Sequence, residues 1–169
     1  RDRPYLIAGV NDWNEAFEAA GFKEAIVARE APTPQEDPEF STEDARYSVI
    51  RYFASETENA YGPRISDPRS GEIIESHIGW YHNVMSLLRN WFFVQTAAIH
   101  EGARGAKLSD EQMGQLVRFV SSHEVGHTLG LLHNFGSSAA YDVDSLRSPA
   151  FTEKYGTAPS VMDLSLIHI

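Results

Sequence analysis

The string HEVGHTLGLLH, which begins at His123, constrains this chain more than any other stretch. His123 and His127 are four residues apart, so on an α-helix both imidazoles face one side and can bind one metal ion. Glu124 lies about a quarter turn away, where it can hold a water molecule without binding the metal. Gly130 is suited to end the helix, after which the chain can turn and bring His133 in as a third ligand. Three neutral nitrogen ligands and an open fourth position are typical of a catalytic zinc site.

The specificity of this motif for a zinc site depends on its length. The HExxH pattern by itself arises by chance in large sets of sequences, and the alternative interpretation is a buried amphipathic helix with incidental histidines. The added glycine and third histidine make chance a poor explanation.

The string resembles the signature of the metzincin zinc peptidases, HExxHxxGxxH followed by a methionine turn. The string SVMD, from Ser160 to Asp163, resembles that turn. The resemblance implies one catalytic Zn²⁺ ion, with Met162 lying beneath the histidines as an apolar, polarizable support. It also implies an α+β fold with a twisted mixed sheet, an antiparallel edge strand and a long active-site helix.

More closely, the chain resembles a family of large, multidomain bacterial zinc-dependent metzincin proteins. The resemblance extends over nearly the whole chain up to Asp163 and is carried by DWNEAFEAAGFKEAI, RYSVIRYF, AYGPRISDPRSGEII, HEVGHTLGLLHNF and DSLRSPAFTEKYGTAPSVMD. In this family an asparagine follows the third histidine, as Asn134 does here. The resemblance implies a larger parent chain and an extracytoplasmic location in bacteria.

The last six residues, LSLIHI, depart from that family, which usually places a tyrosine after the aspartate of the turn. The hexapeptide resembles a translated transposase end sequence of the kind used as a sequencing adapter. We therefore expect residues 1–163 to be a partial catalytic domain that lacks its first strand and C-terminal helix. We expect residues 164–169 to be a non-native tail; the alternative is a genuine apolar tail.

Periodicity and turn residues predict the order of elements. We expect helices over Pro4–Ala20, Asn83–His100 and Ser109 to about Leu129, strands over Glu24–Arg29, Tyr47–Phe53, Tyr61–Asp67 and Ile73–Tyr81, and a loop over Ala31–Asp44. The last helix begins with a capping box formed by Ser109 and Gln112. The residues expected on its core side are Leu116, Phe119, Val120 and Val125.

Charge and composition exclude some partners. The net charge of −10, from 24 acidic and 14 basic residues, argues against nucleic acid or an anionic membrane surface as partner. The absence of cysteine excludes disulfides and thiolate metal sites. No apolar run approaches the length of a membrane span.

The resemblance implies peptide hydrolysis, in which zinc polarises the scissile carbonyl and Glu124 acts as general base. A peptide or protein substrate is then expected to lie extended along an edge strand at Tyr61, Gly62, Arg64 and Ile65. The alternatives are a non-catalytic metzincin-scaffold binding module at the cell surface and a zinc amidase acting on non-peptide amides. Intact histidines and glutamate favour an enzyme over a binding module.

The other titratable residues have simpler interpretations. His77, His82 and His100 are expected to be structural or surface residues, because a lone histidine is seldom a ligand. Asp142 and Asp144 could bind calcium, but two carboxylates are too few to predict a site.

Overall fold

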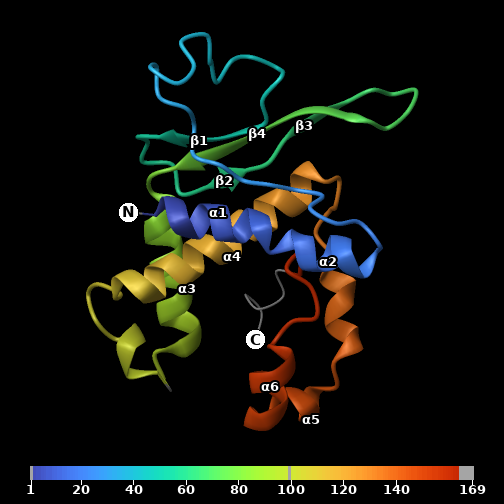
Figure 1. The fold of residues 1–169 in the computed structure, drawn as a ribbon. Coiled ribbons are helices and arrows are strands. Elements are labelled where there is room, and N and C mark those ends of the chain that lie inside the picture. Colours follow the sequence, from blue (N-terminus) through green and yellow to red (C-terminus); the bar gives the residue numbers. More distant parts are fainter. Residues whose placement is uncertain (1, 99, 164–169) are drawn as a thin grey trace. The chain divides into compact units, whose positions relative to one another are not determined.

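The computed structural model describes residues 2–98 and 100–163, which group into two compact units that divide after Gly130. The first unit contains a sheet and the long helix α4 (Asp110–Thr128), and Figure 1 shows α1 (Arg3–Asn11) lying along α4. The second unit contains short helices and a turn. The described residues form no helix that combines the length and apolar character needed to span a bilayer.

The sheet is organised around β4 (Ile73–Tyr81), whose bounds agree with the predicted strand. β1 (Val49–Phe53) pairs with it in parallel, with Val49 opposite His77. β2 (Ala60–Tyr61) and β3 (Arg64–Ser66) pair with it antiparallel on its other side. The predicted α+β architecture, with a mixed sheet and antiparallel edge strands, is therefore confirmed, although the predicted strand Tyr61–Asp67 is divided into two short ones.

The predicted N-terminal helix Pro4–Ala20 is two helices, α1 and α2 (Trp13–Ala19), which meet at Asp12. Tertiary bonds to α4 converge at this junction. The Arg118 guanidinium donates to both Asp12 carboxylate oxygens, at 2.7 and 2.5 Å, and the Trp13 indole N–H donates to the Ser122 carbonyl at 2.8 Å. The helix break at Asp12, which periodicity does not predict, therefore lies where two adjacent residues are hydrogen-bonded to α4.

Gly9 explains how closely α1 and α4 approach each other. A Cβ atom built at Gly9 would lie 2.5 Å from the Arg118 carbonyl oxygen and 2.7 Å from the Ser121 Cβ. Ser121 is fully buried and donates its hydroxyl to the Leu6 carbonyl at 2.9 Å. A glycine that lowers helix propensity thus permits a backbone contact that a larger residue would prevent.

The predicted strand Glu24–Arg29 is wrong, because these residues form no strand. Asparagine side chains from the N-terminal helices take the place of a neighbouring strand. Asn14 donates to the Ile26 carbonyl at 2.8 Å and accepts from its N–H at 3.3 Å, and Asn11 accepts from the Ala28 N–H at 3.3 Å. The predicted loop over Ala31–Asp44 contains neither helix nor strand, as expected.

The helix α3 (Val84–Thr96) and the short 3-10 helix η1 (Glu101–Ala103) precede α4. The predicted capping box of α4 is confirmed: Ser109 Oγ accepts from the Gln112 N–H, and Gln112 Oε1 accepts from the Ser109 N–H, both at 3.1 Å. Buried residues of the first unit form two apolar clusters, Ala60, Trp80, Val84, Leu88, Val117 and Val120, and Val10, Ile78 and Val125.

One expected core residue of α4 is wrong. Phe119 is 36% exposed, whereas Val117, which was not predicted, is fully buried. The buried face of α4 includes Gly114 and Ser121, which hydrophobicity does not mark. Because close contact with α1 selects these small residues, the face that packs is rotated away from Phe119.

The second unit is built from short elements. They are the 3-10 helix η2 (Phe135–Ala140), α5 (Val143–Leu146) and α6 (Pro149–Tyr155), followed by the turn around Met162. α6 begins with Ser148, whose side chain accepts from the Phe151 N–H, and ends at Gly156 with φ +75°. The rings of Tyr141 and Phe151 pack edge to face at 5.1 Å.

Candidate metal centre

The last turns of α4 present His123, Glu124 and His127. Their helical spacing brings the two imidazole ring centroids to 4.8 Å, with the rings perpendicular. His123 and Glu124 are buried, with 6% and 7% of their surfaces exposed, and His127 is partly buried. The helix therefore holds two imidazoles and a carboxylate on packed backbone.

The helix ends where the sequence predicts. Leu129 caps it, and Gly130 takes φ +101°, a conformation that residues with a Cβ rarely adopt. The Arg64 side chain of β3 lies at this end: its Nη1 is 3.4 Å from the His127 carbonyl oxygen. A guanidinium beside the exposed carbonyls of a helix C-terminus is electrostatically favourable.

His133 follows three residues after Gly130 and is exposed. One ring nitrogen from each of His123, His127 and His133 lies within 4.8 Å of the other two. Zinc binds histidine nitrogen at about 2.0–2.1 Å, so small side-chain rotations would bring three nitrogens at this spacing onto one ion. Among residues 2–98 and 100–163, this is the group of potential ligands that the structure brings close enough to share a metal.

Glu124 has the electrostatic character of a buried base. Burial raises the pKa of its carboxyl above the ordinary value, and the nearby charge of His127 lowers the pKa in part. Its Oε2 atom is buried without a hydrogen-bond partner. A buried acceptor without a partner beside three imidazoles fits a site that takes a metal ion and a water molecule.

The backbone of this part of α4 is held from two sides. The Trp13 indole bonds to the carbonyl of Ser122, the residue before the first histidine. On the sheet side, a Cβ built at Gly62 would lie 2.5 Å from the Glu124 carbonyl oxygen. Neither the hydrogen bond of Trp13 nor the close approach of Gly62 has a signal in the sequence spacing.

Met162 lies in a tight turn, as the sequence predicts. The Asp163 N–H donates to the Ser160 carbonyl at 3.0 Å, and the Met162 N–H donates to Ser160 Oγ at 3.1 Å. Met162 is 2% exposed, and its carbonyl accepts from the Asn134 N–H at 2.8 Å. The position of Met162 beneath the histidines stays a prediction.

Comparison with known proteins agrees with this geometry. Residues 105–169 match the model of a family described as Met-zincin. Over these residues the chain is similar to the Met-zincin family. No curated protein and no solved structure matched the chain. Together with the histidine cluster, the match indicates a zinc metallopeptidase-type domain.

The Met-zincin match covers the α4 motif and the methionine turn, and the resembling stretches before residue 105 lie outside it. The matched range also includes residues 164–169, which lie outside the described residues. Their interpretation as an adapter-derived tail stays a prediction.

The residues predicted to bind substrate differ in their surroundings. Ile65 is 60% exposed on β3, whereas the Tyr61 ring packs against Gly79 and lies 5.9 Å from the Tyr81 ring. Gly62 faces the backbone of α4, and Arg64 contacts its C-terminus. Ile65 is more exposed than Tyr61, which is 41% exposed, and the substrate-binding role of all four residues stays a prediction.

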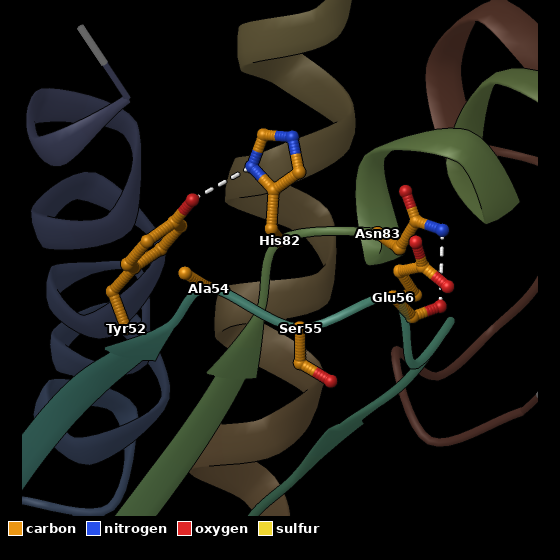
Figure 2. Close-up of a pocket in the computed structure, with 6 residues that line it drawn as sticks. All are labelled: Tyr52, Ala54, Ser55, Glu56, His82 and Asn83. Atoms are coloured by element: carbon orange, nitrogen blue, oxygen red, sulfur yellow. Dashed lines mark hydrogen bonds between the residues drawn. The ribbon is translucent and has the colours of Figure 1, made fainter.

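A concavity lies at the carboxyl ends of β1 and β4 (Figure 2). It is open to solvent, has a volume of about 250 Å³ and is lined by Tyr52, Ala54, Ser55, Glu56, His82 and Asn83. The Tyr52 hydroxyl lies 2.7 Å from His82 Nδ1, and the Asn83 amide donates to the Glu56 carbonyl at 3.0 Å. None of these residues belongs to the histidine cluster of the Met-zincin motif.

The remaining predicted residues have local neighbours. His77 Nε2 lies 2.6 Å from Glu75 Oε1, and the His100 ring packs edge to face on Phe92 at 5.6 Å. The Asp142 carboxylate accepts from the Asp144 N–H at 3.1 Å and thereby caps α5. Asp144 itself forms an ion pair with Arg147 at 3.0 Å. Each of the two aspartates thus has a partner within or next to α5.

Proposed function

We propose that this chain is the catalytic part of a zinc-dependent endopeptidase in which His123, His127 and His133 bind the metal and Glu124 is the general base. The observation that carries the proposal is the spacing of the three imidazoles, whose nitrogens lie within 4.8 Å of one another. An all-nitrogen set of three ligands is typical of catalytic zinc, since it leaves a coordination position open.

Zinc bound by these residues supplies a Lewis acid that polarises the scissile carbonyl and makes an attacking water more acidic. Glu124 accepts the proton of that water and then donates it to the nitrogen of the leaving amine, so that one carboxyl serves both proton transfers. The raised pKa of Glu124 suits this proton exchange, because a general base works best when its pKa is closer to the pH at which it acts. The otherwise unpartnered Oε2 is the atom that we assign to this proton.

The proposed substrate is a peptide in extended conformation, added to the edge formed by β2 and β3. Both strands pair on one side with β4, which leaves main-chain groups on their other side for a peptide. The exposed Ile65 supplies an apolar contact next to that backbone.

The decisive experiment compares metal content and cleavage of a peptide library for the native chain and two variants. Glu124→Gln should retain stoichiometric zinc and lose about 10²–10⁴-fold in rate, because an amide does not accept the proton. His127→Ala should lose the zinc itself. His82→Ala, outside the cluster, is the matched control and should preserve both zinc and cleavage.

Two outcomes would contradict the proposal. Retention of most activity by Glu124→Gln would show that the general base is another group. Stoichiometric zinc without cleavage of any peptide would favour a binding module or an amidase that acts on other amides.

A further inference from the structure

The second unit contains a buried carboxylate that the reaction does not use. Asp163, in the methionine turn, is 1% exposed. Its Oδ2 accepts from the Ser138 hydroxyl at 2.7 Å and lies 2.8 Å from the Ser137 hydroxyl. Removing a carboxylate from water is costly unless hydrogen bonds replace its hydration, so these hydroxyls stabilise Asp163 where it lies.

A main-chain bond connects the same two segments. The Asn134 N–H donates to the Met162 carbonyl at 2.8 Å. Ser137 Oγ also lies 2.8 Å from the Asn134 carbonyl oxygen, so its single proton has two acceptors. The segment from Asn134 to Ser138 is therefore tied to the methionine turn at both of its ends.

His133 directly precedes this tied segment. Residues 131–134 form no helix or strand, and His133 is exposed. Regular structure and burial, which orient His123 and His127 on α4, are thus not available to orient His133. The His133 ring packs edge to face against Phe135, with the ring centroids 5.7 Å apart, and Phe135 belongs to the segment tied to Met162 and Asp163.

We propose that Asp163 is a positioning residue for His133: through Ser137 and Ser138 it holds the segment that presents the third metal ligand. The inference rests on the proposed function for the identity of the ligand set. Asp163 itself does not touch the metal or the substrate. Removing it should therefore weaken the third ligand and leave the histidine pair on α4 intact.

The test measures the zinc affinity of the full chain by competition with a chromophoric chelator, and the visible absorption spectrum of the protein loaded with Co²⁺. Asp163→Ala should weaken zinc binding about 10–100-fold, the range seen when the hydrogen-bond support of metal ligands is lost. Its Co²⁺ spectrum should move toward that of His133→Ala. Asp142→Ala, which removes an aspartate that caps α5 in the same unit, is the matched control and should change neither quantity.

A double-mutant cycle separates positioning from a general structural role. Because Asp163 acts through His133, Asp163→Ala should weaken zinc binding little further in the His133→Ala background. Ser137→Ala combined with Ser138→Ala should reproduce the loss of zinc affinity with the carboxylate present. Ser137→Ala combined with Ser138→Thr, which keeps one hydroxyl, should retain most of the affinity. These serine variants also test the proposal if Asp163→Ala does not fold.

The outcomes distinguish this inference from the proposed function. Absence of zinc binding by the native chain would overturn both. Stoichiometric zinc in the native chain, together with native affinity and a native Co²⁺ spectrum in the Asp163 and serine variants, would overturn the positioning role alone. An equal loss of affinity with and without His133 would also overturn it.

Discussion

The two units hold their candidate ligands by different physical means. In the first, His123 and His127 lie on the long helix α4, which packs against α1 and the sheet. Ser121 and Val117 of this helix are fully buried. In the second, His133 lies outside regular structure, before a segment tied by hydrogen bonds to the methionine turn. Packing holds the helix that carries the first pair of candidate ligands, and hydrogen bonds tie the segment that follows the third.

This difference has a practical consequence. Packing free energy is distributed over many contacts, so the loss of one hydroxyl in the first unit leaves most of the support for the helix in place. A short segment held by a few hydrogen bonds depends on each of them. We therefore expect substitutions in the first unit to change global stability, and substitutions in the second to change metal affinity.

The largest effect on stability is expected for Leu88→Ala on α3. Leu88 is 2% exposed in an apolar cluster with Trp80 and Val117, so truncation leaves a cavity and should lower the free energy of unfolding by about 2–5 kcal/mol. Val94→Ala, at a position that is 79% exposed on the same helix, should change it by less than about 0.5 kcal/mol. Urea denaturation provides the measurement, and equal effects at the two positions would show that this cluster is not the packed core.

A smaller loss is expected for Gly9→Ala. The new methyl group would meet the Arg118 carbonyl oxygen at 2.5 Å, so the helices must separate, and we expect a cost of about 1–3 kcal/mol. The matched change in the second unit, Gly136→Ala, introduces a methyl group whose nearest neighbour is 3.8 Å away and should be nearly neutral. If thermal unfolding shows Gly9→Ala to be stabilising, as helix propensity by itself implies, the close contact between α1 and α4 is wrong.

The smallest effect is expected for Trp13→Phe, which removes the indole N–H from the Ser122 carbonyl and should cost about 1 kcal/mol. Tyr141→Phe in the second unit removes a hydroxyl bonded at 3.1 Å to the exposed Tyr155 carbonyl and should cost less, because water replaces that bond. Comparing the two by chemical denaturation sharpens the contrast between a hydrogen bond within packed structure and one at the surface. A larger loss for Tyr141→Phe would reverse it.

Local chemistry made much of the fold predictable. The capping box of Ser109 and Gln112 and the helix end at Gly130 each depend on residues within a few positions of one another. The strand Ile73–Tyr81 was predicted with its observed bounds because its β-branched and aromatic residues lie between a turn and a helix. The errors include the strand expected at Glu24–Arg29 and the core position expected for Phe119. Both concern residues whose surroundings are set by distant segments.

For the candidate site, the sequence by itself determined the ligand types, their helical spacing and the glycine that ends the helix, since these follow from backbone geometry over eleven residues. Tertiary structure decided what surrounds them. It placed Gly62 against the Glu124 carbonyl, the Trp13 indole on the Ser122 carbonyl, and two serine hydroxyls around Asp163. The partners in these contacts are 25 or more positions apart along the chain, and local periodicity carries no information about pairs so widely separated.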